Sequence, residues 1–363
     1  MTLLPLPPEE GEHRQQMSSQ NVLVIGGTGY FGRLLVDDLV RNVSCNVIAA
    51  SRRPLRSDRF RTIIADLHDH ASLERALDGV AIAICAAGPY QDLPLTLLGL
   101  CVERGIHYID LADDRGFVKK VRHFAANREP GISAVCTGWS TVSALSTLLV
   151  KIAARDMERI DSIHIHMAPG NRGARQAATI ASLLHSVGQP FTIFRNGEWR
   201  TVTGWSEPRD FPFPSPVGKR RGYLVDVPDH ELLPAMFGAR TVEFRAGSEF
   251  VFLNRCLGML RRTGGNWSQW SGLLQRAAAL FSWMGHDWGA IGVEVRGSAT
   301  RRAVVMSESR AERIAVMPAS VMAAELLSGA SHRGVVSHLN WLSEDRLRQE
   351  CEKRNFRFTL EEV

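Results

Sequence analysis

Four glycines lie within the seven residues 26–32, whose sequence is GGTGYFG, between an apolar run and an amphipathic stretch. Such a pattern permits a tight turn out of a strand, close approach of the backbone to a pyrophosphate, and close packing of the next helix on the sheet. The N-terminus of that helix would offer unpaired N–H groups and the positive end of its dipole to an anion. We therefore predict a dinucleotide-binding turn at Gly26, Gly27, Thr28, Gly29, Tyr30, Phe31 and Gly32.

The end of the second expected strand indicates which dinucleotide would bind. Residues 46–50 are expected to form that strand, and Ser51, Arg52 and Arg53 follow, about twenty residues after Gly32. An acidic residue at this place pairs with the ribose 2′-hydroxyl of NAD, whereas arginine accommodates the 2′-phosphate of NADP. A guanidinium also pairs bidentately with phosphate and stacks on adenine. The sequence thus favours NADP; the alternative is a pair of solvated arginines at a strand end.

Candidates for proton transfer follow the next expected strands. Tyr90 comes directly after one of them, and Tyr108, Asp110 and Asp113 cluster around another. Open α/β sheets bind ligands at the carboxyl ends of their strands, where a phenol or a carboxylate can orient or protonate a substrate. We select Tyr108, Asp110 and Tyr90 as catalytic candidates. The alternative for Asp110 and Asp113 is that they cap the following helix or pair with Arg115.

Candidates for substrate binding come later in the chain. His164 and His166 are two residues apart on an expected strand, so their side chains share one face; lining of a core or an active site is favoured over a metal pair, and no metal site is predicted. Arg172 and Arg175 lie in a loop that opens a helix, where they would clamp a carboxylate or remain surface arginines. Trp139 would either wall a substrate pocket or pack between domains.

These residues need strands and helices to position them, and the two alternate through the first third of the chain. That alternation is typical of a parallel, doubly wound sheet, so residues 21–150 are predicted to form a Rossmann domain. Strands are expected at residues 21–25, 46–50, 61–65, 80–85, 107–111 and 132–136. Helices are expected at residues 30–41, 72–77, 95–103 and 117–127.

The pattern changes after residue 150, and residues 151–317 are predicted to form a second α/β domain with a mixed or antiparallel sheet, for substrate binding or dimerisation. Residues 207–216 contain four prolines and are expected to form an irregular loop. Residues 301–302 and 307–313 are expected in an exposed hairpin. Helices within residues 318–363 would return to the first domain. Second-domain strands are expected at residues 160–167, 198–202, 241–245, 291–295 and 302–306.

Composition limits the class of protein. A chain of 363 residues with 45% apolar composition can bury a large core, and its length suggests two domains. The net charge of +5 is modest and dispersed, which suits an anionic cofactor and disfavours a nucleic-acid partner. Six widely spaced cysteines are typical of reduced thiols in a cytoplasmic protein. Residues 1–20 are expected to be a mobile tail, and no transmembrane segment is expected.

Three groups of residues together resemble the saccharopine dehydrogenase-like oxidoreductases: residues 26–32, residues 86–90 (AAGPY), and Cys101 with residues 105–113 (GIHYIDLAD). The likeness covers the N-terminal domain well and extends more loosely into the rest of the chain. It implies a Rossmann domain joined to an α/β substrate domain, frequently as a homodimer. It also implies hydride transfer between NAD(P) and varied substrates, often at carbon-nitrogen bonds.

The resemblance implies contacts along the whole cofactor. The pyrophosphate would face Gly27, Thr28, Tyr30, Phe31 and Gly32. The adenosine end would face Ser51, Arg52 and Arg53, with Asp66 near adenine. The nicotinamide half would be lined by Ala86, Ala87, Gly88, Pro89 and Tyr90. Relatives commonly carry a glycine shortly after the aromatic residue, whereas this chain continues with Gln91-Asp92-Leu93-Pro94, so the shape of this loop departs from the family pattern.

One other dehydrogenase mechanism is excluded by spacing. Short-chain dehydrogenases need a lysine four residues after a tyrosine, because the lysine lowers the pKa of the phenol. The four tyrosines of this chain are followed at that spacing by Leu34, Pro94, Ala112 and Val227. We expect an NADP-dependent oxidoreductase acting on a carbon-nitrogen or conjugated carbon-carbon double bond of a small, carboxylate-bearing metabolite, as a cytoplasmic homodimer. The alternative is a non-catalytic NADP-binding sensor or accessory protein.

Overall fold

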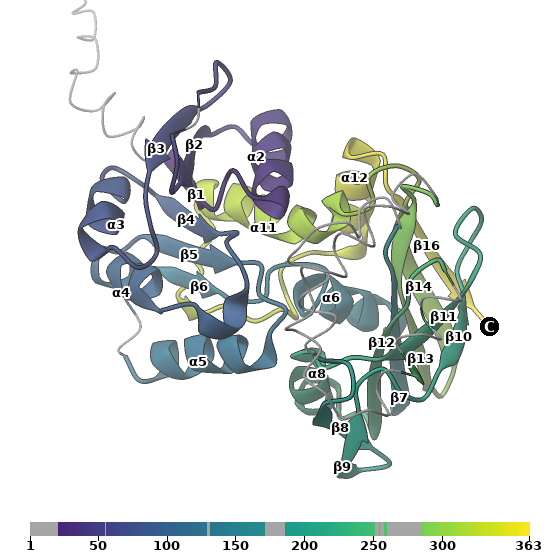
Figure 1. The fold of residues 1–363 in the computed structure, drawn as a ribbon. Helices are drawn as coiled ribbons and strands as arrows, with labels where there is room; N and C mark the ends of the chain where they lie inside the picture. The colour runs from purple at the N-terminus through teal and green to yellow at the C-terminus, as the bar shows by residue number, and fades with distance from the viewer. Residues whose placement is uncertain are drawn as a thin grey trace, which may run out of the picture.

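The computed structural model describes residues 21–54, 56–128, 131–170, 186–250, 254, 258–259 and 285–363. These residues form two sheets of seven strands and one two-stranded hairpin, and the two sheets lie side by side in Figure 1. The expected fold class, a doubly wound parallel sheet with a second α/β domain, is confirmed. None of the described helices is long and apolar enough to cross a membrane. The expected tail at residues 1–20 and the candidates Arg172 and Arg175 lie outside the described residues.

The first sheet is entirely parallel and has the strand order β15-β6-β5-β4-β1-β2-β3. Its strands are short, and β1 and β4 are almost wholly buried, because a parallel sheet is covered by helices on both faces. The strands are β1 (Asn21–Ile25), β2 (Asn46–Ser51), β3 (Arg61–Ile64), β4 (Ile82–Cys85), β5 (His107–Asp110), β6 (Ala134–Cys136) and β15 (Gly334–Val335).

Helices cover both faces of the first sheet. Figure 1 shows α2 (Tyr30–Asn42) and α11 (Arg313–Leu327) on one face. The other face carries α3 (His70–Ala76), α4 (Thr96–Glu103) and α5 (Arg115–Ala126). Carboxylates begin two of these helices as N-caps: Asp69 accepts the N–H of Ser72, and Asp114 accepts the N–H of Phe117. These caps fix where the chain turns from the sheet into each helix.

The second sheet is mixed, with the order β10-β11-β12-β7-β13-β14-β16 and one parallel pair, β12 with β7. Two helices, α6 (Ala144–Ala153) and α8 (Asp229–Phe237), lie on its face toward the first domain (Figure 1). A separate hairpin is made by β8 (Pro190–Arg195) and β9 (Glu198–Thr203). The strands of the large sheet are β7 (Ile160–Ala168), β10 (Arg209–Pro212), β11 (Lys219–Leu224), β12 (Thr241–Ala246), β13 (Gly289–Gly297), β14 (Thr300–Ser307) and β16 (Arg357–Glu362).

The two faces of the second sheet have different cores. Along β7, Ile163 and Ile165 belong to the main hydrophobic core, which also contains residues of α6 and of the first sheet. The alternate residue Ala168 belongs to a small separate core with Phe211 and Phe213 on the opposite face. The first of these faces therefore joins the two domains, and the second is closed by β10 and the loop after it.

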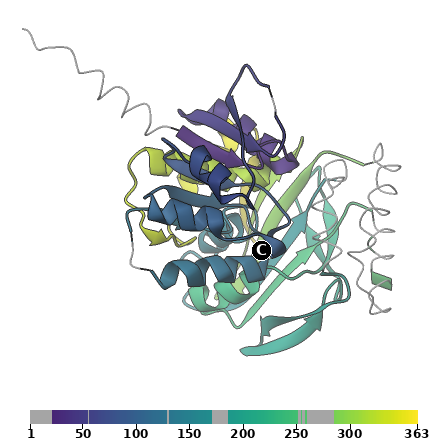
Figure 2. The same ribbon diagram turned by 60° about the vertical axis from the view of Figure 1, so that its left-hand side comes forward.

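The end of the chain passes between the two domains. After β14 the chain returns as α11, which packs beside α2, and as β15, which pairs with β6. It then forms α12 (Glu344–Lys353) and finally β16, which pairs with β14 in the second sheet. Figure 2 shows the same arrangement from another side, with the yellow-green return segment beside the purple start of the chain.

A buried charge cluster joins this return segment to the helix that follows the glycine turn. Arg354 directly follows α12, and its side chain is 1% exposed. Its Nη2 lies 2.7 Å from Oδ2 of Asp38 on α2, its Nε lies 3.0 Å from Oδ1 of the same residue, and its Nη1 donates to Glu350. Two carboxylates and one guanidinium thus hold α2 against the C-terminal segment.

Several elements differ from those expected. The proline-rich residues 207–216 contain the strand β10, which is allowed because β10 is an edge strand and Pro212 at its end has no N–H to offer a further neighbour. Arg301 and Arg302 do lie in a hairpin, which β14 forms with β13, but residues 307–313 are not part of it and lead into α11. The elements α6, α8, β8, β11 and β16 were not expected.

The cluster at Arg354 leads to a prediction about stability. Arg354→Ala should lower the free energy of unfolding by roughly 3–5 kcal/mol, because it leaves the buried carboxylate of Asp38 without a counter-charge and leaves Glu350 with the more exposed Arg346 alone. Urea unfolding measures this change, with Glu352→Ala on the exposed side of the same helix as the matched control. Equal destabilisation by the two substitutions would contradict the role given to the cluster.

Candidate functional site

The strand order places the candidate cofactor residues on one edge. The sheet runs β3-β2-β1-β4-β5-β6, so its order reverses between β1 and β4. Open α/β sheets bind a dinucleotide across the carboxyl ends of the strands at this reversal, with adenosine toward β2. The loops after β1, β2, β4, β5 and β6 all leave from this edge, and the last of them leads through α6 into the second domain (Figure 1).

The glycine turn is built on contacts that leave no room for side chains. Gly26 has a φ of +79°, and a Cβ at this residue would lie 2.8 Å from the backbone N of Ala87 after β4. A Cβ at Gly32 would lie 2.0 Å from the carbonyl O of Gly26, and one at Gly27 would lie 2.9 Å from Cβ of Ala49. The loops after β1 and β4 therefore touch directly, and α2 packs tightly on the turn.

The first turn of α2 offers free donors. Gly29 is its N-cap, and no side chain bonds to this cap. The first amide to donate within the helix is that of Arg33, to the carbonyl O of Gly29 at 2.9 Å. The amides of Tyr30, Phe31 and Gly32 come before it and have no intrahelical acceptor. Three such amides at the positive end of a helix suit a diphosphate, so this turn fits the expected cofactor.

The end of β2 fits the adenosine side. Ser51 is 9% exposed, and its Oγ donates to the carbonyl O of Arg53 at 2.5 Å, which curls the chain after the strand. Arg52 and Arg53 are exposed, and within the described part of the chain neither forms an ion pair with an acidic residue. Asp66, after β3, is a turn residue whose Oδ1 accepts the N–H of His68 at 3.0 Å. Both guanidinium groups are thus available to a phosphate.

The loop after β4 is fixed by Tyr90. Its hydroxyl donates to the carbonyl O of Cys85 at 2.9 Å and accepts the N–H of Leu111 at 3.2 Å. The ring lies 5.2 Å from that of Phe117. Burial raises the pKa of Tyr90 well above its usual value. The structure therefore uses this hydroxyl to join the loops after β4 and β5, beside Ala86, Ala87, Gly88 and Pro89.

Tyr108 and Asp110 both lie inside the sheet. Tyr108 is 2% exposed, and burial raises the pKa of its phenol far above the usual range. Asp110 is fully buried at the end of β5, and its Oδ1 accepts the N–H of Ala112 at 3.0 Å and that of Gly138 at 2.8 Å. Burial raises the pKa of Asp110 to about 6, against the opposing effect of these hydrogen bonds. Asp110 thus binds the loop that follows β6.

The capping role considered for Asp110 and Asp113 belongs to another residue. Oδ1 of Asp114 accepts the N–H of Phe117 at 2.7 Å, because α5 begins one residue after Asp114. Arg115, the first residue of α5, reaches into the second domain, where its Nη2 lies 2.8 Å from Oδ1 of Asp226. The sequence did not indicate this link, because an arginine beside three acidic residues has several nearer candidates.

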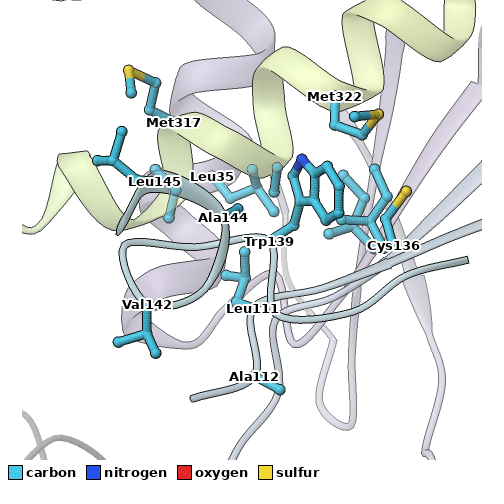
Figure 3. Close-up of a cluster of buried hydrophobic side chains, with 14 of the residues drawn as sticks. Leu35, Leu111, Ala112, Cys136, Trp139, Val142, Ala144, Leu145, Met317 and Met322 are labelled. Atoms are coloured by element: carbon cyan, nitrogen blue, oxygen red, sulfur yellow. The ribbon is translucent and has the colours of Figure 1, made fainter. Parts of the chain in front are cut away.

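Trp139 packs inside the protein. Its side chain is fully buried, and its ring centroid lies 4.7 Å from that of His338 and 6.0 Å from that of Trp341. Figure 3 shows the indole between the chain after β6 and the helix α11, with Met322 and Cys136 nearby. Of the two roles expected for Trp139, the structure shows packing, and its role as a wall of a substrate pocket stays a prediction.

The two histidines of β7 share a face, but they do not reach the cofactor edge. They alternate with Ile163 and Ile165, which point toward α6, so they lie on the face away from the first domain. Nδ1 of His164 lies 3.2 Å from Oε2 of Glu243, and His166 stacks on Phe211. Burial lowers the pKa of both. No cluster that could hold a metal ion occurs in the described ranges.

The structure adds a residue that sequence reasoning missed. Asp229 begins α8 in the second domain and is fully buried, yet its Oδ2 accepts the N–H of Ser143 in the loop after β6. An acidic residue in the first turn of a helix is common, since it favours the helix dipole. The sequence therefore gave no signal that this carboxylate reaches the first domain.

Comparisons with known proteins agree with this geometry. Residues 22–135 match the family model described as the saccharopine dehydrogenase NADP binding domain. The apo histidine-tagged saccharopine dehydrogenase (L-Glu forming) from Saccharomyces cerevisiae has the same fold, with a TM-score of 0.66 at 11% identity over 95% of this chain and 100% of that chain. No curated protein sequence matches this chain.

Two further structures show weaker likeness. An amine dehydrogenase from Mycobacterium smegmatis gives a TM-score of 0.44 at 11% identity over 88% of this chain and 94% of that chain. A myo-inositol dehydrogenase from Corynebacterium glutamicum gives a TM-score of 0.43 at 10% identity over 86% and 89%. The glycine turn and the parallel sheet agree with the family match, and residues 22–135 of this chain belong to the family described as the saccharopine dehydrogenase NADP binding domain.

Proposed function

We propose that this protein is an NADP-dependent oxidoreductase that transfers hydride at a carbon-nitrogen or conjugated carbon-carbon double bond of a small, carboxylate-bearing metabolite. The glycine turn carries the proposal, because its three free amides stand at the reversal of the sheet. Arg52 and Arg53 support the choice of NADP over NAD, since both are exposed at the end of β2. A homodimer in the cytoplasm remains part of this proposal.

Different residues at the carboxyl edge of the first sheet would bind different parts of the cofactor. The nicotinamide ring, when bound, supplies the hydride donor or acceptor. The first turn of α2 would hold the diphosphate, and the guanidinium groups after β2 would hold the 2′-phosphate. The loop after β4 would lie beside the nicotinamide half, in a shape fixed by the hydrogen bonds of Tyr90 to Cys85 and Leu111.

Among the three catalytic candidates, Asp110 is the best suited to move a proton. A general acid or base works best when its pKa lies near the working pH, and burial brings the pKa of Asp110 to about 6. The phenols of Tyr90 and Tyr108 have pKa values raised far above that range by burial. We therefore assign the proton-transfer role to Asp110 and a supporting role to the two tyrosines.

A non-catalytic NADP-binding sensor is the second candidate, and one observation favours it. Asp110 is fully buried, and its Oδ1 is already engaged by two backbone amides. A proton donor with no access to substrate would leave a protein that binds the cofactor without turning it over. The two functions differ in one measurable property, which is steady oxidation of NADPH with a substrate.

Cofactor preference tests the two arginines. The wild type should bind NADPH at least about tenfold more tightly than NADH, because hydrogen bonds to a charged phosphate contribute roughly 1.5–3 kcal/mol each. The double substitution Arg52→Ala with Arg53→Ala should weaken NADPH binding to the level of NADH and leave NADH binding unchanged. Cofactor fluorescence measures both affinities, with Arg41→Ala at the far end of α2 as the control. Equal affinities in the wild type would contradict the assignment.

The effect of pH on stability tests the burial of Asp110. Its raised pKa means that the folded protein holds this proton more tightly than the unfolded chain does. Its contribution to the free energy of unfolding is therefore full below pH about 4 and is lost as the pH rises through about 6. Asp110→Asn cannot ionise and keeps an oxygen for the two amides, so it should be more stable than the wild type at pH 7, by up to about 3 kcal/mol.

Urea unfolding between pH 4 and 7.5 measures this difference, and Asp92→Asn at an exposed position is the matched control. A difference between Asp110→Asn and the wild type that does not change with pH would contradict the assigned burial. In NADPH oxidation, the same variant should lower kcat by roughly 10²–10⁴ if Asp110 transfers a proton. An unchanged kcat would remove Asp110 from the reaction.

A further inference from the structure

The loop between β6 and α6 contains a strained turn. Ser143 has φ of +69° and ψ of −66°, a region that residues other than glycine rarely adopt. The amide of Ala144 donates to the carbonyl O of Val142 at 3.0 Å, which closes a three-residue γ-turn around Ser143. Strain of this kind persists only where neighbouring groups enforce it, and it occurs often at functional sites.

A carboxylate from the other domain enforces this turn. Oδ2 of Asp229 accepts the N–H of Ser143 at 3.0 Å, and Oδ1 accepts the hydroxyl of Ser146. Asp229 is fully buried, and among the described residues no lysine or arginine forms an ion pair with it. Both of its carboxylate oxygens accept hydrogen bonds from residues at the start of α6.

The other end of the same loop is held by Asp110. Oδ1 of Asp110 accepts the N–H of Gly138 at 2.8 Å, and its carbonyl O accepts the N–H of Trp139 at 2.8 Å. The two ends also touch, since a Cβ at Gly138 would lie 3.1 Å from Cβ of Ser143. A change in the turn at Ser143 is therefore transmitted to Gly138 and to the carboxylate at the end of β5.

We propose that Asp229 is a positioning residue of the second domain that holds the turn at Ser143 and thereby sets the shape of the β6–α6 loop and the orientation of Asp110 beside the nicotinamide half of the site. This inference rests on the function proposed above for that edge of the sheet. The loop takes this shape when α8 is docked, so the cofactor edge of one domain is completed by the other.

Substitutions at Ser143 separate positioning from plain packing. Asp229→Ala removes the acceptor, so the loop relaxes from its strained shape. Glycine adopts the φ of Ser143 without strain, so Ser143→Gly should keep the loop in shape even without Asp229. Ser143→Ala is the matched control, because it removes the same hydroxyl and keeps the Cβ that causes the strain. Asp229→Asn is the conservative variant, since its amide oxygen can still accept the N–H of Ser143.

Hydrogen exchange of the backbone amides of residues 144–147 reports the shape of the loop in the full-length protein. Asp229→Ala should speed this exchange by about tenfold or more, since a loss of 1.4 kcal/mol is a tenfold change in an equilibrium. Adding Ser143→Gly should restore slow exchange, adding Ser143→Ala should not, and Asp229→Asn should remain close to the wild type. Equal exchange in the two double variants would overturn the proposal.

Fluorescence of bound NADPH provides the functional arm. Asp229→Ala should change the emission of the bound nicotinamide and alter NADPH affinity by less than about threefold, because the phosphate contacts are elsewhere. Ser143→Gly should restore the emission, and unchanged emission in Asp229→Ala would overturn the proposal. If Asp229→Ala does not fold, the proposal predicts that adding Ser143→Gly restores folding and that adding Ser143→Ala does not. Failure of both added substitutions to restore folding would overturn the proposal. A wild type that binds no NADPH would defeat the proposed function only, and hydrogen exchange would still test the clamp.

Discussion

The cofactor edge depends on one contact between two pieces of bare backbone. Gly26 lies against the N of Ala87 so closely that no Cβ fits, and a Cβ at Gly32 would lie even closer to the carbonyl O of Gly26. These approaches bring the loops after β1 and β4 together at the reversal of the sheet, and they press α2 onto the turn so that its free amides point out of the edge. Side chains could not replace this arrangement, because a diphosphate must approach the main chain itself.

Buried carboxylates are used in two different ways around this edge. Asp38 on α2 faces the guanidinium of Arg354, so charge balances charge and the helix is held to the C-terminal segment. Asp110 and Asp229 instead face backbone amides and hydroxyls, and burial raises the pKa of each to about 6. A buried carboxylate that faces amides and hydroxyls, with no counter-charge, lowers the free energy of unfolding at neutral pH. Its benefit is a fixed direction for the N–H groups of the β6–α6 loop.

The strands of the first sheet and the glycine turn were predictable, because short-range sequence patterns determine them. The strands of the first sheet are apolar runs because both faces are covered, and the glycine turn is recognisable from its spacing. The roles of single side chains were harder to predict. Trp139 packs against Trp341, whose own Nε1 donates to the carbonyl O of Ala144, 197 positions away in sequence. Nothing near Trp139 shows that this partner will cover it.

The histidines of β7 show the same limit. Alternation along a strand correctly predicts that His164 and His166 share a face, but it does not say which face turns to the first domain. That choice is made by α6 on one side and by Phe211 of β10 on the other. Likewise, Asp229 meets Ser143 across 86 positions of sequence, and only the docking of α8 brings the two together.

The C-terminal segment belongs to both domains, and this affects the order in which the two domains can fold. Asp38 meets Arg354 across 316 positions, β15 completes the first sheet, and β16 is the outermost strand of the second. N-terminal domains generally fold first during synthesis, but here the nucleotide-binding half lacks α11, β15 and the counter-charge of Asp38 until the strands β7 to β14 of the second sheet have been synthesised. The same late segment therefore completes both sheets, so neither domain is finished before the other is nearly complete.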